Sequence, residues 1–397
     1  MKKVLIIGAG MLQAYVIQKA KEMGYYVLTI DMDSNAIGFQ YADEYEVINI
    51  VNQEECLQYA KKKKIDGVLT AATDYGVLTT SYIARELKLN GLDYNVAKII
   101  KNKYEVRKIM AQQKVDDTAQ FFEVKTEKEL NNICNEINFP VIVKPVDGSG
   151  SKGVSKAKNK EELLDIYNIA SKQSLSHKVL IETFIIGQEY GVESFVLNGN
   201  VNILGIMKKH MTKPPYYAEL GHSLPAGISS DLRKKIEKVV TNTINALNIN
   251  FGSVNMDLLV TSDEKVYIVD IGCRMGGNLI GSHVIPYSTG IEYMENIIRA
   301  CVGDEVDFQP KLEKCISTRI LALTPGIVKE LPDFNKYMED KRIKYIFCKL
   351  KKGEKIETYR NNLDGCGYVV VEASTIEEAE RLAEEIKQKI DKDIKRQ

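Results

Sequence analysis

The stretch from Val141 to Val154 contains residues whose types and spacing suit phosphate binding. An apolar run interrupted by Lys144 and closed by Pro145 predicts a buried strand that brings one ammonium group to a fixed point. The loop that follows alternates small and polar residues: Gly148, Ser149, Gly150, Ser151, Lys152 and Gly153. Such a loop can turn backbone N–H groups and hydroxyls toward one anion without obstruction from Cβ atoms. It is not the GxxxxGK[ST] loop, because the basic residue precedes the glycines, and a plain surface hairpin is the alternative reading.

Two aspartates also interrupt apolar strand-like runs. Asp257 lies in GSVNMDLLV and Asp270 in KVYIVDIGC. Placing a carboxylate in such a strand is costly unless a cation or a hydrogen-bond network neutralises it. With phosphate-binding lysines nearby, the pair implies Mg²⁺, which prefers oxygen ligands and bridging phosphates. Mn²⁺ is the alternative ion.

Other polar residues have two readings each. Glu182, Glu189 and Glu193 are spaced by seven and four residues, which by itself also fits the polar faces of strands. Lys103 lies in a helical segment predicted from Asn95 to Met110, where an isolated lysine normally faces solvent. The irregular span 202–229, which contains Lys208 and His222, is either a substrate loop or a plain connection.

The elements that position these residues begin with a βαβ unit. A strand ends in the glycines Gly8 and Gly10, a helix follows, and a second strand closes on Asp31. This is the outline of a dinucleotide-binding unit, but Gln13 stands where the third glycine belongs. An NAD-binding oxidoreductase or sensor is therefore kept as the alternative from another functional class. Asp74 follows a later strand of this unit, where it either touches a substrate or caps a helix.

The composition narrows the class of protein. The chain has 397 residues, with 44% hydrophobic and 27% charged residues, which is typical of globular domains. Lys+Arg and Asp+Glu both number 54, so no net positive charge favours nucleic acid or a membrane surface. Seven scattered cysteines without a CxxC pair favour reduced thiols in the cytoplasm. We expect no targeting segment and no membrane span.

The order of these features resembles the ATP-grasp superfamily of carboxylate-amine ligases. A helix lysine is followed by a strand lysine with KP, a glycine-serine loop, ExFIxGxEY, and an acidic strand pair that ends in RxGG. The resemblance covers nearly the whole chain. It implies a mixed α/β and α+β fold with a Rossmann-like pre-ATP-grasp domain at 1–94 and a two-lobed ATP-grasp domain at 95–310, whose lid lobe spans about 115–180. A small C-terminal αβ region at 311–397 would complete the ligase.

The resemblance also implies roles for individual residues. ATP would be held by Lys103 and Lys144 at its phosphates, by the loop Gly148–Gly153 as a lid, by Glu182 and the backbone of Phe184 and Ile185 at adenine, and by Glu189 at the ribose. Metal ligands would be Asp257 and Asp270, and Arg274 would stabilise the oxyanion, with a structural salt bridge as its alternative role. Substrate contacts would come from Asp74, Lys208, His222, Asn278 and Arg319.

One departure from the family pattern concerns the metal. The family's second acidic strand ends in Glu-x-Asn-x-Arg, whereas this chain has Asp270, Gly272 and Arg274. Because Gly272 provides no amide ligand, the sequence leaves open whether one or two metal ions bind. Asn278, Asn255 or water could substitute.

The sequence therefore predicts an ATP-dependent ligase that forms an amide through an acyl phosphate and releases ADP and phosphate. The RMGGN ending favours an amino acid as one substrate, and a purine-pathway or carbamoyl-phosphate-type ligase is the alternative. We expect small-molecule carboxylate and amine substrates and no nucleic acid or membrane partner. A homodimer is open, because related ligases are often dimers. Substrate identity and pathway do not follow from the sequence.

Overall fold

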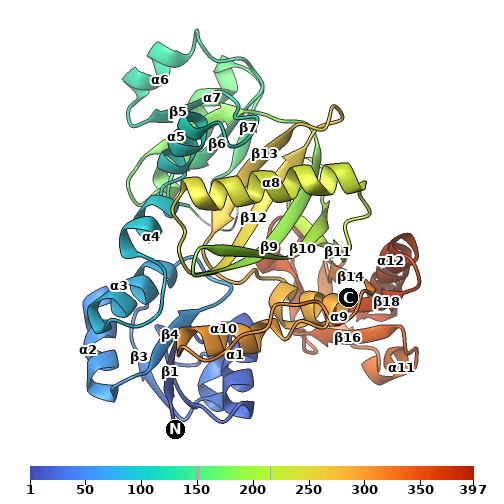
Figure 1. The fold of residues 1–397 in the computed structure, drawn as a ribbon. Coiled ribbons are helices and arrows are strands. Elements are labelled where there is room, and N and C mark those ends of the chain that lie inside the picture. The colour runs from blue at the N-terminus through green and yellow to red at the C-terminus, as the bar shows by residue number, and fades with distance from the viewer. Residues whose placement is uncertain (149, 151, 215) are drawn as a thin grey trace.

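The computed structural model describes residues 1–148, 150, 152–214 and 216–397 (Figure 1). The predicted mixed α/β fold is confirmed. Ser149 and Ser151, both predicted to bind phosphate, lie outside the described residues.

The first sheet is parallel and has the strand order β3-β2-β1-β4. Its elements are β1 (Lys3–Ile7), α1 (Met11–Glu22), β2 (Tyr26–Asp31), η1 (Ile37–Tyr41), β3 (Glu44–Val47), α2 (Gln53–Lys63), β4 (Gly67–Thr70) and α3 (Val77–Leu87). Residues Val4 to Ile7 are fully buried, as expected for a strand covered on both faces. The Asp31 carboxylate accepts the N–H of Ala9 at 2.7 Å, so it stabilises the glycine turn.

A four-stranded antiparallel sheet forms the lid lobe, at the top of Figure 1. Its elements are β5 (Phe121–Val124), α6 (Glu127–Ile133), β6 (Val141–Pro145), β7 (Ser155–Ala157), α7 (Lys160–Gln173) and β8 (Val179–Thr183). Two helices, α4 (Tyr94–Ile100) and α5 (Lys103–Gln113), lead into it. The prediction of one helical segment from Asn95 to Met110 was wrong, because Asn102 ends the first helix and caps the second. Its side chain accepts the N–H of Tyr104 at 3.0 Å.

The central sheet has eight strands in the order β13-β12-β9-β10-β11-β14-β18-β16. The strands are β9 (Gln188–Leu197), β10 (Asn200–Met211), β11 (Glu219–Leu224), β12 (Gly252–Val260), β13 (Val266–Gly272), β14 (Cys315–Ile320), β16 (Ile343–Cys348) and β18 (Gly367–Ala373). The span 202–229 is thus mostly strand, and among the described residues the irregular backbone predicted there is limited to 212–214, 216–218 and 225–229. Helix α8 (Ser230–Ala246) lies across this sheet (Figure 1) and buries Ile236, Val240 and Ile244.

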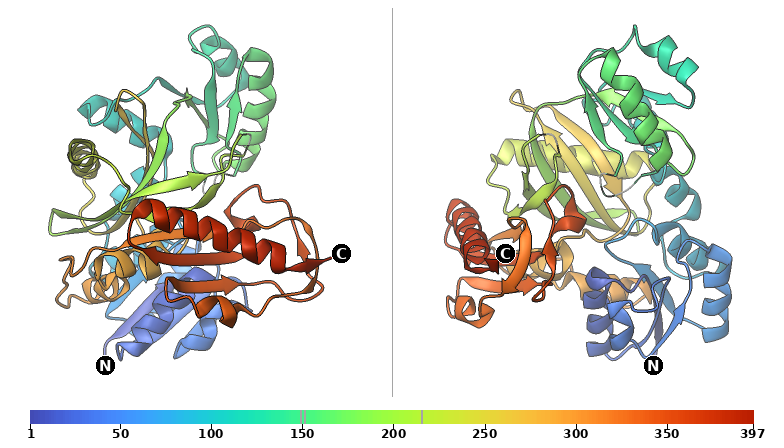
Figure 2. Two further views of the ribbon diagram at one scale, coloured as in Figure 1. Left: turned by 90° about the vertical axis from the view of Figure 1, so that its right-hand side faces the viewer. Right: turned by 180° about the vertical axis from the view of Figure 1, so that it is seen from behind.

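The remaining elements lie around the first and the central sheet (Figure 2). They are η2 (Ile280–Val284), α9 (Ile285–Thr289), α10 (Tyr293–Cys301), β15 (Gly326–Glu330), α11 (Phe334–Met338), β17 (Lys355–Ile356), η3 (Asn362–Asp364), α12 (Ile376–Asp393) and β19 (Lys395–Arg396). Thr375 caps α12 by accepting the N–H of Glu378 at 3.2 Å, and the Glu378 carboxylate accepts the N–H of Ser374 at 3.2 Å. In the described part of the chain, no helix combines the length and apolar character that crossing a bilayer requires.

Candidate active site

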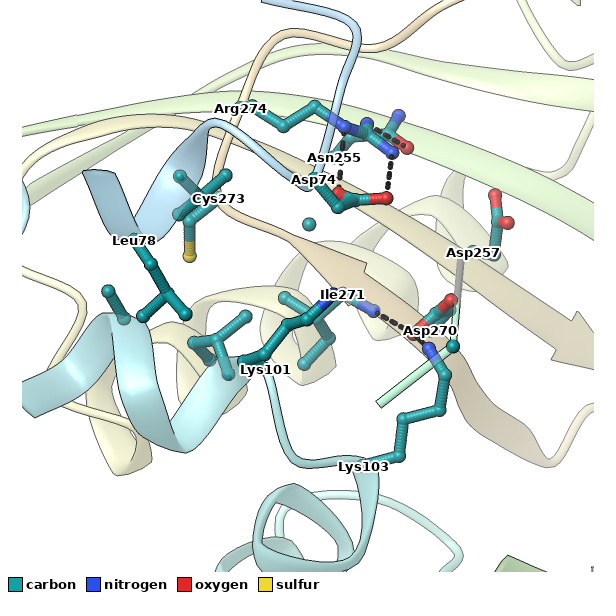
Figure 3. Close-up of a pocket in the computed structure, with 15 residues that line it drawn as sticks. Asp74, Leu78, Lys101, Lys103, Asn255, Asp257, Asp270, Ile271, Cys273 and Arg274 are labelled. Atoms are coloured by element: carbon teal, nitrogen blue, oxygen red, sulfur yellow. Dashed lines mark hydrogen bonds and ion pairs between the residues drawn. The ribbon is translucent and has the colours of Figure 1, made fainter. Parts of the chain in front are cut away.

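A cavity of about 840 Å³ lies between the lid lobe and the central sheet. Its lining comes from β6 and β8 of the lid, from β10 to β13 of the sheet, and from loops of the first and last units. The volume falls within the range of roughly 300–1,000 Å³ that is common for ligand pockets. A small side pocket of about 60 Å³, shown in Figure 3, shares Asp74, Lys103, Asp270 and Arg274 with it.

Lys103 and the two predicted metal ligands meet at this cavity. Lys103 begins α5, and its Nζ lies 2.5 Å from Asp270 Oδ1. Asp257 on β12 pairs opposite Asp270 on β13 in the antiparallel ladder, so both side chains leave the sheet on one face. This strand register brings residues from three separate segments together. Sequence reasoning could not supply it.

Lys144 belongs to a buried group of three charges. Its ammonium forms an ion pair with Glu182, which sits on the neighbouring strand β8, and lies 3.4 Å from the carbonyl oxygen of Val269. Arg107 Nε lies 2.9 Å from the other carboxylate oxygen. Burial opposes ionisation of Glu182, but the two cations outweigh it and lower its pKa to about 2. The carboxylate is thus held ionised in the cavity wall.

Lys209 is surrounded by three carboxylates in the cavity wall. Its side chain is 5% exposed, and its Nζ lies 2.9 Å from Asp257, 3.5 Å from Glu219 and 3.6 Å from Glu189. These three anions raise the pKa of Lys209 despite its burial. Glu219 also lies 3.3 Å from Nδ1 of His222. The set is a dense, mutually neutralised polar cluster.

Arg274 is held between two segments (Figure 3). Its Nε lies 3.0 Å from Asp74 Oδ1, and its Nη1 lies 3.3 Å from Asn255 Oδ1. The helix-capping role predicted for Asp74 stays a prediction. Gly76 occupies the N-cap position of α3, while the Asp74 carboxylate turns toward the guanidinium.

The other predicted residues divide into two groups. Gly148, Gly150, Phe184, Ile185, Glu189, His222 and Asn278 line the cavity. Gly153, Lys208 and Arg319 are absent from its described lining. Lys208 pairs with Glu380 at 3.0 Å, and Arg319 pairs with Glu384 at 3.3 Å. Both of these cations therefore bind α12, and the predicted contact of Arg319 with a substrate carboxylate has no support from this geometry.

Sequence reasoning missed Arg107, Lys209 and Glu219, and it gave Glu193 no role in the site. Arg107 follows Lys103 by four residues and so shares its helix face, a signal that was available. Glu193 is fully buried and accepts hydrogen bonds from Tyr293 at 2.7 Å and from Asn255 at 2.9 Å. Burial raises its pKa to about 7. Lys209 and Glu219 gave no separate signal in the sequence.

The donor set of Asp257 and Asp270 suits a hard divalent cation. Both side chains end in carboxylates on one face of the sheet, beside Lys103, which is predicted to bind phosphate. Oxygen ligands are what Mg²⁺ prefers. No cluster of three or more His, Cys, Asp or Glu side chains in metal-binding arrangement occurs among the described residues. The remaining ligands would therefore be water and phosphate oxygens, as is usual for Mg²⁺ at nucleotide sites.

Two family models match the chain. A model described as ATP-grasp domain matches residues 137–282, and one described as L-amino acid ligase C-terminal domain 2 matches residues 319–395. The chain contains an ATP-grasp domain. The first match contains Lys144, Glu182, Asp257 and Asp270, all of which line the cavity.

Known proteins resemble this chain along most of its length. Phosphoribosylglycinamide synthetase from Anaerococcus prevotii has a TM-score of 0.80 and 26% identity, covering 100% of this chain and 99% of that one. L-amino acid ligase from Bacillus licheniformis has a TM-score of 0.84 and 22% identity, with 100% and 99% covered. Formate-dependent phosphoribosylglycinamide formyltransferase from Prochlorococcus marinus (strain NATL1A) is 24% identical over 278 residues, 67% of this chain and 68% of that protein. The protein is an enzyme of the ATP-dependent carboxylate-amine ligase type, which forms C–N bonds.

Proposed function

We propose that this ligase activates the carboxylate of an amino acid with ATP and Mg²⁺ and joins it to an amine. The acid would become an acyl phosphate, the amine would attack its carbonyl carbon, and ADP and phosphate would be released. One observation carries the proposal. Lys103, Lys144, Asp257, Asp270 and Arg274 line a single cavity between two lobes, although they come from distant parts of the sequence.

The nucleotide would lie along the lid side of the cavity. Lys103 and Lys144 would contact its phosphates, and the loop Gly148–Gly153 would close over them. Glu182 and the backbone of Phe184 and Ile185 would contact adenine. Glu189 would accept the ribose hydroxyl protons. These roles are supported by the position of the residues around one cavity.

Asp257 and Asp270 would hold the magnesium ion. When bound, Mg²⁺ neutralises charge on the phosphoryl group that is transferred. The Asp270 carboxylate and a phosphate oxygen would compete for the ammonium group of Lys103. Lys103 would therefore move from Asp270 to the phosphate when the metal occupies the carboxylate. Mn²⁺ would suit the same oxygen ligands.

The amino acid would lie beside Arg274 and Glu219, where charges of both signs face the cavity. Arg274 can bind a carboxylate and stabilise the oxyanion that develops during attack. Glu219 can bind an ammonium group, with His222 at 3.3 Å and Asn278 at 2.5 Å beside it. A zwitterionic substrate matches this separation of charge, and the match to an L-amino acid ligase C-terminal domain also favours it.

ADP release tests the proposal. The purified enzyme is incubated with ATP, Mg²⁺ and pairs of amino acids, and separately with aminoimidazole ribotide plus bicarbonate and glycinamide ribotide plus formate. We expect turnover with amino acid pairs and a dipeptide product by mass spectrometry. Turnover only with a ribotide pair would replace the amino-acid assignment by the purine-pathway alternative, which the formyltransferase relatives favour.

ADP release, together with an NADH titration, also distinguishes the ligase from an NAD-binding oxidoreductase or sensor. An NAD-binding protein would bind NADH in calorimetry and would release no ADP with any of these substrates. The cytoplasmic location and the oligomeric state stay predictions of the sequence.

A further inference from the structure

We infer that Asp74, from the loop after β4, is a positioning residue for Arg274 and that Gly272 is the residue that makes room for their ion pair. This inference rests on the proposed role of Arg274. It assigns the N-terminal unit a direct part in the chemistry, since Asp74 would set the direction of the guanidinium without touching the reacting atoms.

The ion pair has two contacts. Arg274 Nε lies 3.0 Å from Asp74 Oδ1, and Arg274 Nη2 lies 3.4 Å from Asp74 Oδ2. Their side chains are 17% and 27% exposed, so the pair is shielded from most of the solvent. The Nη2 contact has hydrogen-bond geometry, whereas the Nε contact is a close charge contact without that geometry. Asp74 thus holds one edge of the guanidinium through one hydrogen bond and one charge contact.

The opposite edge of the guanidinium is held by a buried chain of hydrogen bonds. Arg274 Nη1 lies 3.3 Å from Asn255 Oδ1, and the amide nitrogen of Asn255 donates to Glu193 at 2.9 Å. Glu193 also accepts the backbone N–H of Gly276 at 3.1 Å. Since Asn255 is neutral, the anion that contacts the guanidinium directly is Asp74, on the other edge.

The loop that carries Asp74 is fastened to the loop that carries Arg274. Ala71 forms a parallel bridge with Met275, and the N–H of Ala72 donates to the Met275 carbonyl at 3.0 Å. Ala72 has φ of +54°, a left-handed conformation that is strained for a residue with a Cβ atom. The strain lies where the two loops meet, which is the pattern expected when tertiary contacts impose a functional geometry.

Gly272 provides the third observation. A Cβ atom at this position would lie 3.0 Å from Asp74 Oδ1 and 3.1 Å from Arg274 Cζ. Such distances are tighter than ordinary van der Waals contacts, so a Cβ atom would require the side chains of Asp74 and Arg274 to shift by a few tenths of an ångström. The lack of a side chain at 272 thus favours the observed position of the ion pair.

Double-mutant kinetics tests the inference. The variants are Asp74→Asn, Asp74→Ala, Gly272→Ala, Asp74→Ala/Gly272→Ala and Arg274→Gln. Each is assayed for ADP release with the amino acid pair that gives the highest turnover and is titrated calorimetrically with ADP and Mg²⁺. We expect Asp74→Asn to lower kcat about 10- to 100-fold, with KM for ATP and the ADP affinity changed less than about threefold. Gly272→Ala should lower kcat in the wild-type background and cause little further loss in the Asp74→Ala background, a coupling that independent sites do not show.

Asp304→Asn is the matched control. Asp304 also forms an ion pair with the N-terminal unit, to Lys2 at 2.6 Å, but it is not part of the described cavity lining. It should leave kcat unchanged. The inference is overturned if Asp74→Asn keeps kcat, if the Asp74 and Gly272 effects multiply independently, or if Asp304→Asn lowers kcat equally. Unchanged kcat in Arg274→Gln would instead remove the proposed role of Arg274 itself.

Discussion

At the scale of single residues, the buried carboxylate of Glu182 has a double use. It neutralises Lys144 and Arg107, and it is the residue proposed to contact adenine. A carboxylate that accepts from two cations has lone pairs left for one more donor. Its electrostatic role therefore does not compete with the proposed contact, and the two can be separated by experiment.

Glu182→Gln should destabilise the protein by about 3–5 kcal/mol at pH 7, because it leaves two buried cations without their anion. The pKa of Glu182 is lowered from 4.5 to about 2. A group with a lowered pKa contributes stability above its unfolded value and loses it as pH falls toward the folded value. The difference between variant and wild type should thus be constant from pH 7 to 4.5 and shrink below pH 4.5, measured by urea unfolding at pH 7, 4.5 and 3. A difference that grows on acidification contradicts this account.

The metal ligands allow a second prediction. Asp257→Asn and Asp270→Asn should each raise the Mg²⁺ concentration for half-maximal ADP release about 10- to 100-fold, because each removes one charged ligand. Calorimetric titration with Mn²⁺ in the presence of ADP gives a readout that does not depend on activity. Asp263→Asn is the control, since Asp263 lies in the turn between the same two strands and its side chain is 60% exposed. Equal effects of all three variants would remove the assignment.

At the scale of elements, the sequence predicted the strands and helices better than their connections. Apolar runs such as Val4 to Ile7 and the Thr375 cap are local signals, and both were read correctly. The break before Lys103 was missed because the apolar pattern continues through it, although Asn102 carried a capping signal. The span 202–229 was misread because its lysines, histidines and prolines hide the alternation of two strands.

The candidate site was predictable only where a residue type is unusual for its element. Lys144 and the two aspartates stand out in apolar strands, and all three line the cavity. Lys209 and Glu219 do not stand out, because they occupy polar-looking strands. Their contact depends on the pairing of β9, β10, β11 and β12, which one sequence does not determine.

The cap of α5 carries the prediction for this scale. Asn102→Ala should lower the free energy of unfolding by about 1 kcal/mol, because it removes the N-cap of α5. Lys103 is the first residue of this helix, so the loss of the cap should also displace Lys103 and raise KM for ATP several-fold. Asp93→Ala is the matched control, since Asp93 caps α4 by accepting the N–H of Asn95 at 2.7 Å. It should lower thermal stability similarly and leave KM unchanged. If both variants raise KM alike, the position of Lys103 does not depend on its cap.

At the scale of the whole molecule, the site exists only because separate units face one cavity. The lid supplies Lys144 and Glu182, the central sheet supplies the aspartates, and the N-terminal loop supplies Asp74. The segment 184–187 joins β8 of the lid to β9 of the sheet.

Ile186 in this connection is 79% exposed, although it lines the cavity. Partial burial of an isoleucine side chain by bound nucleotide and a closed lid is worth roughly 1 kcal/mol, or about fivefold in affinity. Ile186→Ser should accordingly raise the calorimetric Kd for ADP and Mg²⁺ about fivefold and leave the melting temperature nearly unchanged. Leu175→Ser is the control, because Leu175 is 80% exposed on the same lobe but does not belong to the described lining. A Kd that changes equally in both variants, or in neither, would show that the nucleotide does not bury this side of the cavity.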